Sequence, residues 1–168
     1  MKQLREIFGY LLGFLMFIVG IPAIMWLVSG RPEIALSCSW NNIVGAIIGL
    51  TGLILSIWTI IYMKVVGRGN PMDAFDHEIA PHTQHLMTGG VYRICRNPML
   101  LGTFLYLAGI ALVLLSWQSA VVWVAFVIIM SFQVASEETR LERDFGQEYL
   151  DYKKRTGRFS PLVTVKVP

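Results

Sequence analysis

The sequence predicts an all-α integral membrane protein, with four transmembrane helices and a C-terminal amphipathic helix in the cytoplasm, folded as a single membrane domain over residues 1–168. Three observations lead to this prediction: the composition, the charge-free stretches and the distribution of basic residues. Of the 168 residues, 55% are hydrophobic and 15% are charged, and the mean hydropathy is +0.58. Soluble domains contain roughly 45–50% apolar and about 25% charged residues, so this composition is typical of a protein surrounded by lipid.

The first two spans are predicted from charge-free stretches in the N-terminal part of the chain. No residue between Glu6 and Arg31 is charged, and a spanning helix needs about 20 residues, so the first span is placed near residues 8–29. This stretch is longer than the apolar part of a secretory signal and lacks an A-x-A-like cleavage site, so a retained helix is expected. The second charge-free stretch becomes apolar after Asn42, which places the second span near residues 43–66.

The third and fourth spans are predicted from one long stretch. No residue from Asn97 to Ser136 is charged, and a single helix of that length would measure about 60 Å, twice the thickness of the hydrocarbon core. The stretch is therefore expected to fold back on itself at its polar segment, residues 116–119. The third span is then near residues 99–115 and the fourth near residues 120–135.

The basic residues indicate how the spans are oriented. Of the 14 Lys and Arg residues, all but Arg31 precede the first span, lie in or next to the loop 67–98 that joins the second and third spans, or follow the fourth span in the tail 137–168. Arg31 lies between the first and second spans, on the opposite side of the membrane. By the positive-inside rule both termini and the loop are cytoplasmic. The basic surplus thus reflects topology, with a weak attraction to anionic membrane lipid, and no nucleic-acid partner is expected. Cys38 and Cys95 fall on opposite sides and are not expected to pair.

The cytoplasmic tail is expected to begin as an amphipathic helix. Leu141, Phe145, Tyr149 and Tyr152 recur at steps of four, four and three residues, which places them on one helical face. Such a helix lies along the headgroup layer or folds back over the end of the bundle, and in both positions it would act as a lid.

Small residues in the first two spans predict close helix packing. Gly9 and Gly13, and likewise Gly45 and Gly49, have the small-xxx-small spacing that lets membrane helices approach one another. The spacing fits packing within the bundle and also fits a homodimer, so both arrangements stay open.

Three blocks in the second half of the chain form a recognisable pattern. They are residues 86–92 (LMTGGVY), then residues 96–98 (RNP) with Gly102, and then Glu137-Glu138, Leu141, Phe145-Gly146, Tyr149 and Tyr152, followed by Arg158-Phe159 and Pro161. This pattern resembles the integral-membrane methyltransferases, a superfamily that includes isoprenylcysteine carboxyl methyltransferases and phospholipid N-methyltransferases. The resemblance covers the chain from about Gly67 to Pro161. The variant with Asn97 is common in bacterial relatives, which indicates a bacterial or archaeal cytoplasmic membrane.

The resemblance implies a methyltransferase that uses S-adenosyl-L-methionine and acts on a lipid-like or small-molecule acceptor at the cytoplasmic face. It leaves open whether oxygen, nitrogen or sulfur is methylated. The donor would be bound within residues 82–161, with the acceptor entering sideways between helices. The catalytic candidates are Arg96 and Glu138. The cofactor-binding candidates are Gln84, His85, Leu86, Met87, Gly90, Tyr92, Asn97, Pro98, Met99, Leu100 and Glu137, and the substrate-binding candidate is Gln133.

These residue types suit the chemistry of the donor, which carries a sulfonium, a carboxylate, an ammonium, a ribose and an adenine ring. Asn97 and Pro98 suit the first turn of a helix, where free N–H groups bind a carboxylate. Gly90 lets the backbone approach a ligand closely, and Tyr92 supplies an apolar wall. Glu137 can accept hydrogen bonds from hydroxyl or ammonium groups. For an amine acceptor, Glu138 is a candidate base.

Two other functions are compatible with the sequence. Some membrane sterol reductases resemble the same C-terminal block, so an NADPH-dependent reductase is one alternative. A non-enzymatic four-helix membrane adaptor is the other, favoured by Leu100, where the family has an aromatic residue, and by Gln133, where prenylcysteine enzymes have an arginine. A metal site is not expected, because His77, His82 and His85 lack the H-E-x-x-H spacing and a cysteine partner.

Overall fold

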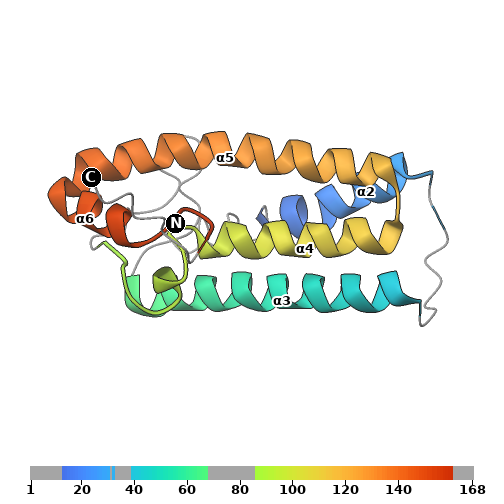
Figure 1. Ribbon diagram of the computed structural model, residues 1–168, viewed down its shortest axis with the longest axis horizontal. Helices are drawn as coiled ribbons and strands as arrows, with labels where there is room; N and C mark the ends of the chain where they lie inside the picture. The colour runs from blue at the N-terminus through green and yellow to red at the C-terminus, as the bar shows by residue number, and fades with distance from the viewer. Residues whose placement is uncertain (1–12, 31, 33–38, 68–85, 161–168) are drawn as a thin grey trace, which may run out of the picture.

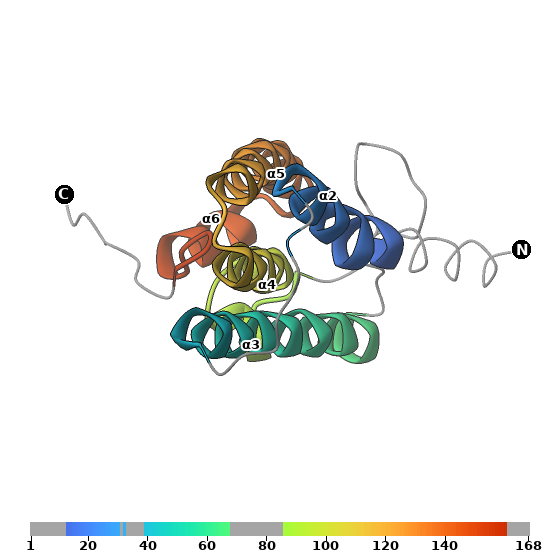
Figure 2. The same ribbon diagram turned by 90° about the vertical axis from the view of Figure 1, so that its right-hand side faces the viewer.

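The computed structural model describes residues 13–30, 32, 39–67 and 86–160, and all regular secondary structure within them is helical. Helices run along the long axis of the molecule, with α4 between α3 on one side and α2 and α5 on the other (Figures 1 and 2). In chain order the elements are η1 (Phe14–Gly20), α2 (Ile21–Val28), α3 (Trp40–Tyr62), η2 (Met63–Gly67), η3 (Gly90–Arg93), α4 (Pro98–Leu114), α5 (Trp117–Phe145) and α6 (Gln147–Arg155).

Two helical stretches of the described chain are long and apolar enough to cross a membrane. They are Trp40–Val66, with 27 residues, and Trp117–Phe145, with 29 residues. Leu15–Val28 and Pro98–Leu114 are apolar but shorter. The four spans therefore remain a prediction from the sequence, and the start of the first predicted span lies outside the described residues.

The helix formed by η1 and α2 changes its hydrogen-bonding pattern near Pro22. Proline has no N–H to donate to the carbonyl four residues earlier, which here belongs to Ile18. The hydroxyl of Tyr106, on α4, donates to the Ile18 carbonyl at 3.1 Å instead. The proline is accommodated because a side chain from another helix satisfies the carbonyl it leaves free.

The contact between α3 and α4 is made largely by small residues. The buried residues of α3 are Gly45, Gly49, Gly52, Ser56 and Thr59, which lie on one helical face. A Cβ atom on Gly52 would lie 2.4 Å from the backbone oxygen of Gly102 on α4. The packing expected of Gly45 and Gly49 is thus found inside one chain, and the large apolar side chains of α3 point away from α4.

The chain turns between α4 and α5 where the polar segment 116–119 predicts it. α4 ends at Leu114, and Leu115 adopts a left-handed backbone conformation with φ 44°. α5 begins at Trp117. The indole of Trp123, on α5, donates to the Phe104 carbonyl of α4 at 3.0 Å, which ties the two helices together.

The start of the tail differs from the expectation. α5 continues to Phe145 without a break after residue 136, and the chain bends at Gly146, where φ is 53° and ψ is −126°. α6 follows and runs beside the end of α5 (Figure 1). The expectation of one continuous helix through Tyr149 and Tyr152 was wrong, because glycine readily adopts a positive φ that interrupts a helix.

Candidate functional site

One end of the bundle carries a buried cluster of aromatic residues contributed by the loop and by α6. Val91, Tyr92, Tyr149 and Tyr152 are buried together, and Leu141 and Phe145 pack against them from α5. Leu141 and Phe145 of α5 thus meet Tyr149 and Tyr152 of α6 in one cluster, although the four were expected on one face of a single helix. This cluster attaches α6 to the segment that carries the first motif block.

The tyrosines of this cluster hold the tail through a hydroxyl group. The hydroxyl of Tyr152 donates to the backbone oxygen of Tyr92 at 2.7 Å. Burial raises the pKa of Tyr92, Tyr149 and Tyr152, because a phenolate would lose its hydration, and the charge of Glu137 raises the pKa of Tyr92 further. These groups therefore stay protonated, and the Tyr152 hydroxyl keeps the proton that it donates to the loop.

The glycine pair of the first motif block lies against Tyr62, the last residue of α3. Gly90 has φ 57°, and a Cβ atom there would lie 2.4 Å from Cε2 of Tyr62. The rings of Tyr62 and Tyr92 have centroids 6.3 Å apart. Gly90 is thus required both by the backbone turn and by the close approach of the ring. Sequence reasoning missed Tyr62, because a tyrosine at the end of a membrane helix is indistinguishable from an interfacial residue.

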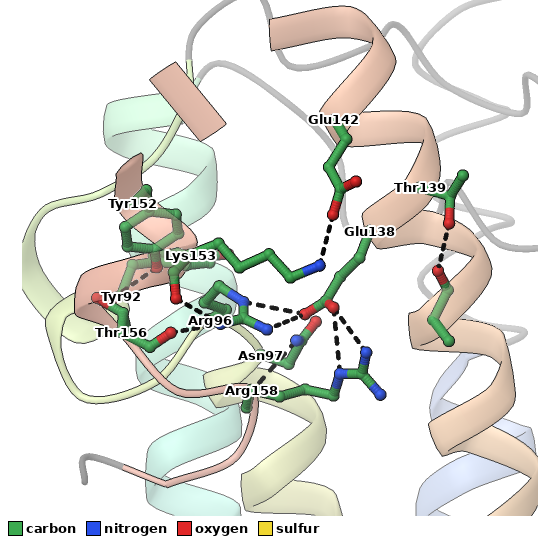
Figure 3. Close-up of polar contacts among 11 residues, drawn as sticks. Tyr92, Arg96, Asn97, Glu138, Thr139, Glu142, Tyr152, Lys153, Thr156 and Arg158 are labelled. Atoms are coloured by element: carbon green, nitrogen blue, oxygen red, sulfur yellow. Dashed lines mark hydrogen bonds and ion pairs between the residues drawn. The ribbon is translucent and has the colours of Figure 1, made fainter. Parts of the chain in front are cut away.

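Arg96 and Glu138 form a buried ion pair. The Nε and Nη2 atoms of Arg96 donate to Oε1 of Glu138 at 3.0 and 2.8 Å. The side chains of the two residues are 8% and 3% exposed. The Nη1 atom of Arg96 donates to the backbone oxygens of Lys153 and Thr156, at the end of α6 (Figure 3). Arg96 thereby joins the loop to α5 and α6.

Arg158 holds the other oxygen of the same carboxylate. Its Nε and Nη2 atoms donate to Oε2 of Glu138 at 3.2 and 2.7 Å (Figure 3). This ion pair raises the pKa of the Arg158 guanidinium. Sequence reasoning included Arg158 in the third motif block but gave it no role in the site. The motif indicated that Arg158 matters, but its pairing with Glu138 depends on how the segment after α6 folds back onto the start of α4.

The tail is also attached through its backbone, beside the start of α4. The N–H groups of Arg96 and Asn97 donate to the backbone oxygens of Gly157 and Arg158 at 2.9 and 3.2 Å. The side-chain amide of Asn97 donates to the same Arg158 oxygen at 3.5 Å. The N–H of Asn97 was expected to be available for a ligand, but it is taken by the tail.

The other candidates on α4 lie in and beside the core. Pro98 and Leu100 are buried, and Met99 is half-buried. The backbone oxygen of Met99 accepts a hydrogen bond from the Ser56 hydroxyl at 2.9 Å. By helix geometry, Met99 and Leu100 carry N–H groups without an acceptor inside α4, since both lie in its first turn.

The remaining candidates surround this end of the bundle. Leu86 and Met87 are half-buried and pack against the aromatic cluster. Glu137 and Gln133 are half-buried on α5, one helical turn apart. Gln84 and His85 lie outside the described residues, as do His77 and His82. Within the part of the chain that the structure describes, no group of three His, Cys, Asp or Glu side chains is placed to hold a metal ion.

Comparison with known proteins agrees with the pattern of motifs. A family model described as phospholipid methyltransferase matches residues 40–148, well over half of the chain. The chain belongs to the phospholipid methyltransferase family. The match begins at the first residue of α3, so the family region extends further toward the N-terminus than the motif blocks indicated.

Two curated relatives of this phospholipid methyltransferase family member have a stated activity. The protein-S-isoprenylcysteine O-methyltransferases of Mus musculus and Rattus norvegicus are each 36% identical to the chain over 83 residues, which is 48% of this chain and 29% of the relative. The chain therefore matches less than a third of the length of these enzymes. An uncharacterized protein of Haemophilus influenzae is 40% identical over 45 residues, covering 27% of this chain and 68% of that protein. No solved structure matches the chain.

Proposed function

We propose that the protein transfers the methyl group of S-adenosylmethionine to a small or lipid-like acceptor at the cytoplasmic face of the membrane. One observation carries the proposal. The motif blocks of the loop and of the C-terminal part of the chain meet at one end of the bundle, the first through the bond from Tyr152 to Tyr92 and the second through the ion pair of Arg96 with Glu138. The membership of the chain in a methyltransferase family supports the same reaction.

The residues at this end of the bundle fit the methyl donor. S-adenosylmethionine, when bound, supplies an electrophilic methyl group on a sulfonium. Leu86 and Met87 are half-buried beside the aromatic cluster and offer apolar surface for its adenine ring. Glu137 offers a carboxylate to hydroxyl or ammonium groups. The aromatic cluster and α6 would exclude water from a donor bound beside them, which favours an in-line displacement in which charge is dispersed.

Glu138 acts in this proposal as a positioning residue. Both of its oxygens accept pairs of hydrogen bonds from guanidinium groups. A carboxylate held in this way is a poor proton acceptor, because protonation would break one of the two pairs. Glu138 therefore fixes Arg96 and Arg158, and a base for an amine acceptor would have to come from another group. A carboxylate acceptor, already ionised, would need no base.

The membrane arrangement belongs to the same proposal. Four spans, near residues 8–29, 43–66, 99–115 and 120–135, would place both termini and the site on the cytoplasmic side of a bacterial or archaeal cytoplasmic membrane. The basic residues at the site end of the bundle support this orientation. The donor would then arrive from the cytosol, and a lipid-like acceptor from the bilayer.

Donor binding gives the direct test. Calorimetric titration of the detergent-purified chain with S-adenosylhomocysteine should show saturable binding, and Glu137→Ala should weaken it by about 1.5–3 kcal/mol if the carboxylate makes a charged hydrogen bond. Thr139→Ala is the matched control, because Thr139 is exposed two residues further along α5 and its hydroxyl bonds only within the helix. No binding by the folded chain at millimolar ligand would overturn the proposal.

A non-enzymatic adaptor of the same fold is the second candidate. It is favoured by the internal use of Arg96, whose three guanidinium nitrogens all donate to acceptors within the protein. Incubation with a methyl-labelled donor and total membrane lipid separates the two functions. A labelled product identified by mass supports the methyltransferase, whereas donor binding without any product supports the adaptor.

A further inference from the structure

Arg158 differs from Arg96 in its exposure, although both hold the same carboxylate. The side chain of Arg158 is 37% exposed, compared with 8% for Arg96. Arg158 contacts Glu138 through Nε and Nη2, and no acceptor for its Nη1 atom is found among the described residues. Arg158 therefore has one edge of its guanidinium turned toward Glu138 and another edge accessible from outside.

The position of Arg158 is fixed by its surroundings. Its backbone oxygen accepts hydrogen bonds from the N–H and the side-chain amide of Asn97. The next residue, Phe159, packs its ring against Phe104 on α4, with centroids 5.2 Å apart. An arginine whose backbone and one guanidinium edge are both held loses little further conformational freedom when it binds a ligand. This favours binding by the remaining edge of the guanidinium.

The charges of the cluster point to the sign of that ligand. Arg96 and Arg158 carry two positive charges, and Glu138 between them carries one negative charge, which leaves the cluster with one unbalanced positive charge. Of the neighbouring charged residues, Lys153 is paired with Glu142, and the carboxylate of Glu137 lies near enough to act electrostatically on Tyr92 and Tyr149. A planar guanidinium edge matches a carboxylate, which can accept two parallel hydrogen bonds.

We infer that Arg158, rather than Arg96, binds the carboxylate of the amino-acid part of the methyl donor. The inference rests on the proposed function, because it assumes that the donor binds at this end of the bundle. It assigns Arg96 to holding the loop, α5 and α6 together. It assigns ligand contact to Arg158, whose guanidinium is held by Glu138 and whose side chain is half-exposed.

The test compares two ligands that differ in the amino-acid part. S-adenosylhomocysteine carries the carboxylate, whereas 5′-methylthioadenosine has the same nucleoside and thioether without it. In the full chain in detergent, Arg158→Gln should weaken binding of S-adenosylhomocysteine by about 10- to 100-fold and leave binding of methylthioadenosine within about twofold. Arg158→Lys, which keeps the charge but loses the fork, should fall between the wild type and Arg158→Gln.

The matched control is Arg155→Gln, which removes a tail charge whose Nε bonds only within α6. It should leave both affinities unchanged. An equal loss for both ligands in Arg158→Gln would show that the residue acts only through the fold, and unchanged affinities would show that it does not touch the donor; each result overturns the inference. If Arg158→Gln does not fold, the ligand comparison is made in Arg158→Lys. Failure of the wild type to bind either ligand would instead overturn the proposed function.

Discussion

The central feature at the scale of single residues is a carboxylate placed between two guanidinium groups. Glu138 is 3% exposed, and burying an ionised carboxylate without partners is very unfavourable. The pairs from Arg96 and Arg158 compensate this cost by neutralising the charge and by satisfying both oxygens (Figure 3). The three residues come from the loop, from α5 and from the segment that follows α6, so one carboxylate determines how three segments meet.

Removal of the Glu138 carboxylate should destabilise the protein strongly. Glu138→Ala leaves the buried guanidinium of Arg96 without its counter-charge, and breaking a buried pair in this way costs about 3–5 kcal/mol. The matched control is Glu142→Ala, one helical turn later on α5. The side chains of Glu142 and its partner Lys153 are 33% and 39% exposed, so this ion pair should contribute only about 0–1 kcal/mol. Thermal unfolding of both variants in the same detergent measures the difference, and equal shifts would contradict this account.

Cys95 should react slowly with thiol reagents. It is fully buried, and burial raises the pKa of its thiol, more strongly than the charge of Arg96 lowers it. The reactive thiolate is therefore scarcer at pH 8 than in a free cysteine with a pKa of about 8.5. In a Cys38→Ser background, maleimide labelling of the native protein should be far slower than labelling after denaturation. Comparable rates would show that the segment around Cys95 opens readily.

Some of the site could be predicted at this scale and some could not. Arg96, Asn97 and Glu138 were identified because their spacing follows a family pattern, and the structure brings them together. The role of Arg158 depends on the tail folding back onto α4, through hydrogen bonds to the Arg96 and Asn97 backbone. Backbone pairing between irregular segments has no signature in the side-chain sequence, so this role could not be read in advance.

At the scale of helices, the decisive contact is between α3 and α4. A Cβ atom would lie 2.4 Å from backbone atoms of the other helix at Gly52, and at the same distance at Gly109. Backbones that approach this closely gain dispersion contacts along their length, which is a main source of helix association in lipid. The spacing of Gly45 and Gly49 predicted close packing, but the partner helix could not be identified from one sequence.

Enlarging Gly52 should therefore disrupt the pair of helices. In Gly52→Ala the new methyl group meets the Gly102 oxygen and the Tyr106 nitrogen, which are backbone atoms that cannot move aside. Overpacking of this kind costs about 1–3 kcal/mol. Thr51→Ala, at the exposed neighbouring position, should change stability by no more than about 0.5 kcal/mol. Thermal unfolding of the two variants in the same detergent measures the difference. Equal stability of Gly52→Ala and Thr51→Ala would contradict the close packing of α3 on α4.

The boundary of α5 shows what composition can and cannot predict. The charges that begin at Glu137 correctly indicate the end of apolar sequence, but the residues that follow are good helix formers and the helix continues through them. The real boundary is Gly146. A glycine inside a helical pattern is ambiguous in sequence, because it is tolerated in a helix as well as at its end.

At the scale of the whole molecule, the two ends of the bundle differ in chemistry. Trp40 and Trp117 are the first residues of α3 and α5, at the end opposite the site, and they are 79% and 73% exposed. Exposed tryptophans at helix ends are typical of the membrane interface. The ion pairs found among the described residues, by contrast, lie at the site end, around Glu138 and α6.

This asymmetry predicts the orientation of the protein in a membrane. In a chain without its native cysteine at position 38, a membrane-impermeant maleimide should label Trp117→Cys in intact spheroplasts of the expression host. It should label Lys154→Cys, which is exposed on α6, only after the membrane is lysed, because the positive-inside rule predicts that the basic end faces the cytoplasm. The opposite pattern of labelling would reverse the orientation and place the site outside.

The glycine contact also limits the routes by which a hydrophobic molecule could reach the site. Carbonyl oxygens and amide nitrogens of α3 and α4 lie so close together along Gly45, Gly52, Gly102 and Gly109 that no acyl chain fits between them. The lipid-like acceptor proposed above would therefore have to pass between a different pair of helices. The close contact between α3 and α4 would thus direct the proposed lipid-like acceptor to the other sides of the bundle.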